Sequence, residues 1–217
     1  MKIAILISGR GSNMERLIEA AAAPDYPAEV VKVISNRPGT SGRETAAKAG
    51  IETQAIDHKS FESRAAFDAA LEQSLNDADV DLVCHAGFMR ILTDEFAARW
   101  QGRMVNIHPS LLPSFKGIRV QQQAIDAGAT ISGCTVHYII PALDSGPIIS
   151  QAAVPVLPND TADTLSARIL KAEHVLYPAA VRRIASGEVK LVDGKVVRSS
   201  DAKGADTECP PLFSPAP

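Results

Sequence analysis

Strand-like runs alternate along this chain with segments of helical periodicity, and this alternation limits the fold more than any other feature. Five such runs occur within the first 108 residues. The stretch between each pair of runs carries apolar residues at helical spacing. This pattern is typical of a mostly parallel sheet with helices on both faces. We therefore predict a single α/β domain built on an open, twisted, mostly parallel sheet.

The positions of the elements follow from the same pattern. Strands are expected at residues 3–7, 30–35, 52–56, 80–86, 104–108, 130–140 and 148–156. Helices are expected at residues 13–23, 43–49, 60–75, 94–100 and 121–127, with a long helix from Thr161 or Asp163 towards Ser186. Ser60 and Ser63 are candidate caps of the third helix. Pro178 removes a helix hydrogen bond, so we expect it to kink or split the long helix. Residues 189–192 and 195–197 are predicted to form a hairpin.

The most informative motif runs from Asn106 to Pro113. Asn106 and His108 stand two positions apart on a predicted strand, so their side chains share one face. Pro109 cannot donate a ladder hydrogen bond, so the strand is expected to end there. The pair then lies at the carboxyl end of a strand, where open α/β sheets bind ligands. A neutral donor beside a titratable donor suits a carbonyl oxygen that gains negative charge during a reaction.

Asp144 is a candidate third member of this group. It lies in a predicted turn 36 residues after His108, and an ionised carboxylate near an imidazole favours the charged ring and fixes its orientation. Thr135 and His137 share the face of their strand opposite to Cys134, so His137 can join the same cluster.

Two other chemistries have weaker support. Ser110, His108 and Asp144 could form a hydrolase triad, but the chain has no G-x-S-x-G elbow. Cys134 and His137 have a spacing that suggests a metal site, yet they alternate across a strand and no second ligand pair follows. We therefore expect no metal.

A Gly-rich turn lies between the first strand and the first helix, at residues 8–13. Backbone N–H groups at such a helix N-terminus can hold an anion. Met14 stands where a dinucleotide fingerprint has its third glycine, and no Lys follows the glycines as in a P-loop. The turn therefore favours a single phosphate, with tight strand–helix packing as the structural alternative.

The bulk properties exclude several classes of function. The formal net charge of -3 gives no support to nucleic-acid binding. No apolar run approaches 18 residues, so we expect no transmembrane helix. The apolar stretch at the N-terminus is too short for a signal peptide. The three cysteines cannot all pair, which fits reduced thiols in the cytoplasm. The segment 199–217 lacks apolar periodicity and is expected to be a disordered tail. We therefore expect no nucleic-acid partner and no membrane. Small-molecule substrates and a monomer or homodimer are also expected.

Together these segments resemble the glycinamide ribonucleotide formyltransferases of purine biosynthesis. The resemblance covers residues 1–197 and rests on the segments 7–13, 86–92, 106–113, 133–137, 143–149 and 172–174. The Asn-x-His-Pro-Ser-Leu-Leu-Pro segment with the later Asp belongs to the wider formyltransferase and deformylase superfamily. The Gly-Ser-Asn turn is specific to the phosphoribosylglycinamide substrate. The resemblance implies a Rossmann-like formyltransferase fold over residues 1–198, with a phosphate-binding half at about 1–100 and a folate-binding and catalytic half at about 101–198.

The resemblance also implies an activity. The formyl group of 10-formyltetrahydrofolate would pass to the glycine amine of 5′-phosphoribosylglycinamide, without a metal. Asn106, His108 and Asp144 would be catalytic, with Thr135 and His137 in support. The implied substrate-binding residues are Gly11, Ser12, Asn13 and Glu173. The implied folate-binding residues are Arg64, Met89, Arg90, Ile91, Leu92, Asn106, Ile140, Pro141, Ala142, Leu143 and Asp144.

Three related functions remain as alternatives. A formyltetrahydrofolate hydrolase would use the same trio with water as nucleophile. It would not need the phosphate turn, and it often carries an extra N-terminal domain. A methionyl-tRNA formyltransferase would need a basic surface and a larger C-terminal domain. A non-catalytic binding module would not need the whole trio. Gln121 and Leu170 depart from the family pattern, which leaves the details of the substrate-side loop open.

Overall fold

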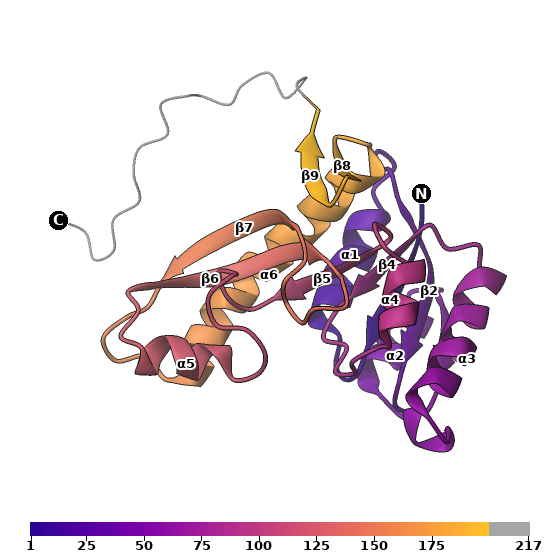
Figure 1. Ribbon diagram of the computed structural model, residues 1–217, viewed down its shortest axis with the longest axis horizontal. Coiled ribbons are helices and arrows are strands. Elements are labelled where there is room, and N and C mark those ends of the chain that lie inside the picture. Colours follow the sequence, from indigo (N-terminus) through magenta and orange to yellow (C-terminus); the bar gives the residue numbers. More distant parts are fainter. Residues whose placement is uncertain (200–217) are drawn as a thin grey trace.

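The computed structural model describes residues 1–199. Seven strands form one open sheet in the order β3-β2-β1-β4-β5-β6-β7 (Figure 1). The strands are β1 (Lys2–Ile7), β2 (Glu29–Ser35), β3 (Glu52–Ala55), β4 (Leu82–His85), β5 (Met104–His108), β6 (Ile131–Tyr138) and β7 (Ile148–Pro155). The first five strands pair in parallel, whereas β6 runs antiparallel to β5, and β7 antiparallel to β6. The predicted mostly parallel α/β sheet is confirmed.

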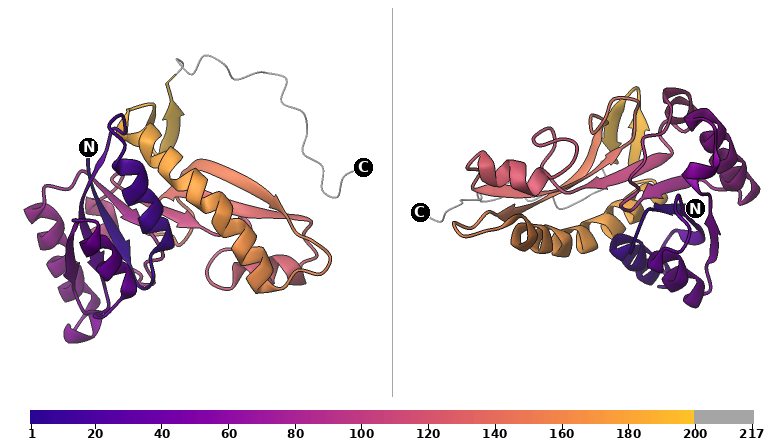
Figure 2. Two further views of the ribbon diagram at one scale, coloured as in Figure 1. Left: turned by 180° about the vertical axis from the view of Figure 1, so that it is seen from behind. Right: turned by 90° about the horizontal axis from the view of Figure 1, so that it is seen from below.

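The helices cover both faces of this sheet (Figure 2). They are α1 (Ser12–Ala21), α2 (Ser41–Lys48), α3 (Arg64–Asp77), α4 (Asp94–Arg99), α5 (Val120–Asp126) and α6 (Ala162–Ala185), with a 3-10 turn at His58–Ser60. A hairpin of β8 (Val189–Val192) and β9 (Lys195–Arg198) follows α6. All the predicted strands and helices are present, with ends that differ by a few residues. The predicted disordered tail lies outside the described residues, apart from Ser199.

Alternation along each strand sends side chains into two separate cores. Val105 and Ile107 of β5 join the core that α1 and α6 cover, whereas Met104 joins the core under α3 and α4. Because neighbours at positions i and i+2 share a face, Asn106 and His108 lie on the Met104 side. The chemistry-bearing face of β5 is therefore the face opposite to α1 and α6.

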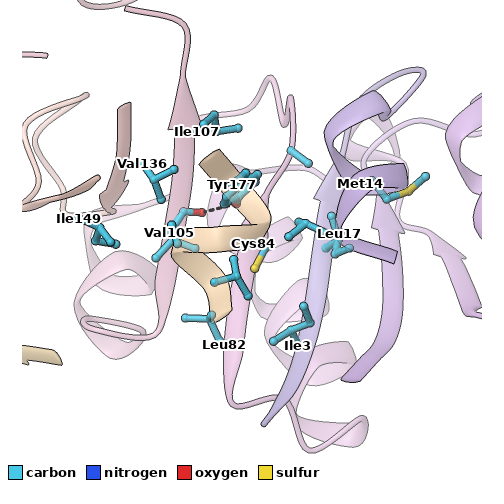
Figure 3. Close-up of a cluster of buried hydrophobic side chains, with 14 of the residues drawn as sticks. Ile3, Met14, Leu17, Leu82, Cys84, Val105, Ile107, Val136, Ile149 and Tyr177 are labelled. Atoms are coloured by element: carbon cyan, nitrogen blue, oxygen red, sulfur yellow. Dashed lines mark hydrogen bonds between the residues drawn. The ribbon is translucent and has the colours of Figure 1, made fainter. Parts of the chain in front are cut away.

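The first core anchors the long helix α6 to the middle of the sheet. In Figure 3, Tyr177 lies close to Val105 and Cys84. The Tyr177 hydroxyl donates to the carbonyl oxygen of His85 at 2.9 Å and to that of Val105 at 3.3 Å. Burial of a large aromatic ring whose hydroxyl finds acceptors fixes α6 against β4 and β5. This contact holds the middle of α6, which also carries Glu173, against the sheet.

Two local predictions need correction. Helix α3 begins at Arg64, and its cap is Ser63, whose hydroxyl accepts from the Ala66 N–H at 3.1 Å, so Ser60 is not the cap. Helix α6 continues through Pro178 as one helix of 24 residues, so the predicted split is wrong. Buried side chains on both sides of the proline, including Tyr177 and Val181, hold the helix to the core. This packing outweighs one lost backbone hydrogen bond.

The strand order changes direction between β1 and β4, which creates a crevice at the carboxyl edge of the sheet. The loop after β1 and the loop after β4 meet there, because the Met89 N–H donates to Ser8 Oγ at 2.7 Å. Figure 1 shows β6, β7 and α5 extending to one side of this crevice, away from the N-terminal strands. No helix within residues 1–199 is both long enough and apolar enough to cross a membrane.

Candidate active site

His108 and Asp144 face each other at the carboxyl end of β5. His108 Nδ1 lies 3.6 Å from Asp144 Oδ1, and both side chains are almost fully buried. The other ring nitrogen, His108 Nε2, is 3.0 Å from the carbonyl oxygen of Phe115. A carbonyl can only accept, so Nε2 carries a hydrogen and donates it to Phe115. Nδ1 is therefore the ring nitrogen that faces the carboxylate.

Asn106, two positions before His108 on β5, completes the predicted trio. Its Nδ2 lies 3.3 Å from His137 Nε2, directly across the β5–β6 ladder. His137 Nε2 is in turn 4.0 Å from Asp144 Oδ1. The structure thus brings Asn106, His108, Asp144 and His137 into one cluster, as the sequence predicted.

Thr135 holds the turn that follows β5. Its hydroxyl donates to the Ser110 carbonyl at 2.7 Å and accepts from the Leu112 N–H at 3.0 Å. Gln151 of β7 donates to the same hydroxyl at 3.0 Å and to the Leu112 carbonyl at 2.8 Å. Thr135 is fully buried and pairs with His108 across the β5–β6 ladder, and its hydroxyl fixes the backbone beyond His108.

Ser110 does not form a hydrolase triad. Its hydroxyl donates to the carbonyl oxygens of Ser114 and Phe115, at 2.7 and 2.9 Å. His108 also donates to the Phe115 carbonyl. Ser110 and His108 therefore share an acceptor and do not bond to each other, which removes the base that a serine nucleophile requires.

The segment 115–117 was not predicted to contact the trio. Besides the Phe115 carbonyl, the Gly117 N–H donates to Asp144 Oδ2 at 2.9 Å, and Lys116 Nζ donates to Ser145 Oγ at 2.6 Å. Gly117 has φ 81°, a left-handed conformation that favours glycine. The glycine itself was the one signal in the sequence, and it indicates a turn without showing what the turn contacts.

His85 is a further buried polar residue that lies next to the cluster in the sheet. It pairs with Asn106 across β4 and β5, so His85, Asn106 and His137 form one row. Its ring makes an edge contact with Phe88 at 5.1 Å, and Nε2 is buried without a hydrogen-bond partner. Burial, with a smaller contribution from His137, lowers the pKa of His85 to about 3. The ring is therefore neutral at physiological pH.

The predicted phosphate turn lies at the N-terminus of α1. Gly11 caps the helix with φ 74°, in the left-handed region, and Ser12 begins the helix. Asn13 Nδ2 donates to Glu173 Oε2 at 2.7 Å, and both side chains are buried. Burial raises the pKa of Glu173, and the hydrogen bond from Asn13 opposes this shift. Asn13 Oδ1 is buried without a partner, so a polar ligand at this turn would supply the missing contact.

The loop after β4 carries the first group of predicted folate-binding residues. The Arg90 guanidinium lies 4.4 Å from the centre of the Phe67 ring on α3. Met89 is held by its N–H bond to Ser8. Arg64 is exposed at the start of α3, one turn before Phe67.

The apolar members of the folate-binding prediction are mostly exposed. Met89, Ile91 and Leu143 have exposed side chains, whereas Leu92 is buried in the second core. Ile140 is half-buried, and Pro141 and Ala142 are exposed in the turn that leads to Asp144. Exposed apolar side chains on the loop after β4 and on the turn between β6 and β7 are typical of a ligand site rather than of a core.

The two departures from the family pattern lie away from the trio. Gln121 is half-buried on α5, and Leu170 is half-buried on α6, one turn before Glu173. A hollow of about 460 Å³ adjoins the first of these. It is lined by Lys116, Ile118, Arg119, Gln122, Gln123 and Asp126. The trio does not line it, so this hollow flanks the reaction centre.

Among residues 1–199, no group of three or more His, Cys, Asp or Glu side chains is arranged to hold a metal ion.

Fold and site together define a class of protein. An open α/β sheet presents an amide, an imidazole and a carboxylate at one edge, beside a turn suited to an anion, as in enzymes that transfer a group at a carbonyl carbon. The chain belongs to the formyl transferase family, whose model matches residues 1–181. The family resemblance drawn from the sequence is thereby confirmed.

Individual relatives agree with this assignment. The phosphoribosylglycinamide formyltransferase of Escherichia coli strain K12 is 40% identical over 191 residues, which are 88% of this chain and 90% of that protein. The trifunctional purine biosynthetic protein adenosine-3 of Bos taurus is 50% identical over 190 residues, which are 88% of this chain but 19% of that protein. The chain thus spans a fifth or less of the length of the trifunctional relatives that it matches.

Solved structures show the same likeness. The phosphoribosylglycinamide formyltransferase of Anaplasma phagocytophilum is 46% identical and superposes with a TM-score of 0.85, over 93% of this chain and 95% of that chain. Glycinamide ribonucleotide transformylase 1 of Symbiobacterium toebii is 42% identical with a TM-score of 0.88, over 91% of this chain and 93% of that chain.

Proposed function

We propose that this protein transfers the formyl group of 10-formyltetrahydrofolate to the glycine amine of 5′-phosphoribosylglycinamide, a step of purine biosynthesis. The observation that carries the proposal is the convergence of Asn106, His108 and Asp144 at the carboxyl end of β5, in a chain that also bonds Asn13 of α1 to Glu173 of α6. Two relatives, 40% and 46% identical to this chain and matched over nearly their whole length, are named phosphoribosylglycinamide formyltransferase, which supports the assignment.

Substrate binding is assigned to the first part of the sheet. In this proposal the N–H groups of Gly11, Ser12 and Asn13 hold the ribose phosphate at the N-terminus of α1. Glu173 accepts from the ribose hydroxyls while Asn13 holds its carboxylate. The half at about 1–100 supplies the phosphate turn, and the half at about 101–198 supplies the folate site and the trio.

The folate co-substrate is assigned to the two loops on the other side of the crevice. The residues at 89–92 and 140–144 flank its ring system, and Arg64 meets its acidic side chain. Exposed Met89, Ile91 and Leu143 supply apolar surface that a bound ring would cover. Burial of that surface holds the formyl group at the trio, and this positioning is itself a large part of catalysis.

The chemical step follows from the geometry of the trio. The neutral glycine amine attacks the formyl carbon, and the formyl oxygen becomes an oxyanion. An N–H of Asn106 and a proton on His108 Nδ1 stabilise that charge. His108 uses Nδ1 for this contact because its Nε2 already donates to the Phe115 carbonyl. Loss of one such donor typically slows turnover by about 10²–10³-fold.

Collapse of the intermediate moves two protons. The bond between the formyl carbon and N10 of the folate breaks, and N10 takes up a proton from His108 Nδ1. The former amine loses one proton, and Asp144 accepts this proton through a water molecule. Asp144 Oδ1 lies 3.6 Å from His108 Nδ1, so it can return the proton to His108. The products are the N-formyl ribonucleotide and tetrahydrofolate, so protons balance without a redox partner.

The cellular setting is also part of the proposal. Cys84 and Cys134 are free thiols in the structure, and free thiols are typical of a reducing compartment. We place the enzyme in the cytoplasm, as a monomer or homodimer with small-molecule substrates.

One assay tests the proposal. Purified protein is mixed with 10-formyl-5,8-dideazafolate, with and without glycinamide ribonucleotide, and release of the deformylated folate is followed by absorbance. Release that requires the ribonucleotide is the expected result. Equal release without the ribonucleotide would assign the protein as a formyltetrahydrofolate hydrolase, and no release in either case would make it a binding module.

A further inference from the structure

His137 is held in a single tautomer by the backbone of its own strand. Its Nδ1 lies 2.9 Å from the carbonyl oxygen of Tyr138. A carbonyl oxygen can only accept, so Nδ1 must carry the hydrogen. The tight packing of Gly146 keeps this carbonyl in place, since a Cβ at Gly146 would come within 1.7 Å of the Tyr138 oxygen.

The ring of His137 is neutral. Burial, the largest cause, lowers the pKa of His137, and nearby His108 and Lys116 act in the same direction. The Tyr138 carbonyl and Asp144 oppose the shift without cancelling it. With the hydrogen on Nδ1 and no second proton, Nε2 carries a lone pair and can only accept a hydrogen bond.

This lone pair dictates how the Asn106 amide is turned. His137 Nε2 and the nearest Asn106 atom, Nδ2, are 3.3 Å apart. If the amide were rotated by half a turn, its carbonyl oxygen would face the lone pair, and two acceptors would meet in a buried site. Within residues 1–199 the Asn106 side chain makes no other hydrogen bond, so His137 is its only orienting partner.

We infer that His137 is a positioning residue that keeps the Asn106 amide turned with its NH2 group, rather than its oxygen, towards the reaction centre. One N–H bonds to His137, and the second is left for the oxyanion. This inference rests on the proposed function, because it assigns the unbonded N–H to the formyl oxygen. A register shift at His137 in the β6–β7 ladder accompanies this arrangement, as is common beside active sites.

The first test does not depend on activity. Nitrogen-15 NMR of the imidazole side chains in the full protein at pH 7 distinguishes the two neutral tautomers and the imidazolium. The expected result is a neutral His137 with its hydrogen on Nδ1. A hydrogen on Nε2, or a charged ring, would overturn the inference whether or not the protein transfers formyl groups.

The second test uses two substitutions that each copy one nitrogen of the ring. His137→Gln places a side-chain oxygen near the position of Nε2, whereas His137→Asn keeps a donor near Nδ1 but leaves nothing at Nε2. We expect His137→Asn to lower kcat by about 10–100-fold with little change in either KM, and His137→Gln to stay within about threefold of wild type. Equal losses in both variants would refute the role.

A double-mutant cycle separates positioning from general damage. If His137 acts only through the amide, His137→Asn causes no further loss of kcat in an Asn106→Ala background. If the double variant instead loses kcat by the product of the two single losses, the inference is wrong. The Tm of each variant is measured in parallel, and a cycle carried out well below the lowest Tm remains interpretable if one variant is less stable.

Discussion

The Asn13 amide donates a 2.7 Å hydrogen bond to the Glu173 carboxylate, although 160 residues separate the two in the sequence. The bond joins the first turn of α1 to the middle of α6, inside the core between them. A buried carboxylate needs such partners, because isolated charge is costly away from water. The arrangement leaves Asn13 Oδ1 and the second carboxylate oxygen for a ligand.

The first prediction concerns this carboxylate. Glu173→Gln keeps the size of the side chain but removes its charge, so the bond to a ribose hydroxyl weakens. We expect the KM for the ribonucleotide to rise about tenfold or more, with a smaller change in kcat. Asp163→Asn, an exposed change at the start of the same helix, is the matched control and should leave the KM unchanged. An unchanged KM in Glu173→Gln would remove Glu173 from the substrate site.

The second prediction concerns proton transfer at His108. In Asp144→Asn the charge that faces Nδ1 is lost, while the Gly117 N–H can still bond to the side-chain oxygen. We expect kcat to fall by about 10²–10³-fold and folate affinity to change little. Steady-state assays give kcat, and fluorescence titration gives the affinity for the folate. Weak folate binding with normal turnover would contradict the assignment, and Asp126→Asn on α5 serves as the control.

The third prediction concerns the turn that carries Asp144. A methyl group at Gly146 would lie 1.7 Å from the Tyr138 oxygen, whereas one at Gly9 would meet nothing within 4 Å. We therefore expect Gly146→Ala to lower the free energy of unfolding by more than about 3 kcal/mol, and Gly9→Ala by far less. Urea denaturation measures both. Similar stabilities for the two variants would mean that the turn can move away from β6 at little cost.

The fourth prediction concerns pH and His85. The pKa of His85 is about 3 in the folded protein against a usual value of 6.5, so below pH 6.5 the unfolded chain binds a proton that the folded chain does not. Stability must then fall as the pH drops from 6.5 towards 3. Between pH 7 and pH 5 this loss is about 2 kcal/mol.

His85→Leu removes this titrating group and fills a similar space. We expect the variant to lose about 2 kcal/mol less than wild type between pH 7 and pH 5, as measured by urea denaturation at each pH. Parallel stability curves for the two proteins would show that His85 becomes protonated while the protein is folded.

Much of the fold was predictable, because the period of the apolar pattern reports directly on the local structure. Strand β5 was predicted with its observed limits, Met104–His108, since apolar residues and the following proline mark both ends. The hairpin after α6 was predicted from Asp193-Gly194, and both residues have the positive φ that this turn requires. The continuity of α6 through Pro178 was not predictable, since it depends on packing against distant strands.

The site was predictable where residues share a strand and less so where loops meet. Asn106 and His108 lie on one face because of strand geometry alone, and His137 follows from the same rule on the next strand. Asp144 was a candidate from its own chemistry, and the family resemblance gave it a catalytic role and added Glu173, which no local pattern joins to the others. The contacts of Phe115 and Gly117 are made by backbone atoms. Backbone groups leave no trace in residue identity, so these contacts were missed.

The antiparallel direction of β6 has a mechanical consequence. His137 is bound into ladders on both sides, to β5 and to β7, and it holds the Asn106 amide. Asp144 instead lies in the turn between β6 and β7, where it has a left-handed φ of 45°. Any displacement of that turn therefore moves the carboxylate relative to an amide that stays still. In the proposed mechanism, the amide that stabilises the negative charge is thus fixed within the sheet, whereas the carboxylate that transfers protons is carried by a turn.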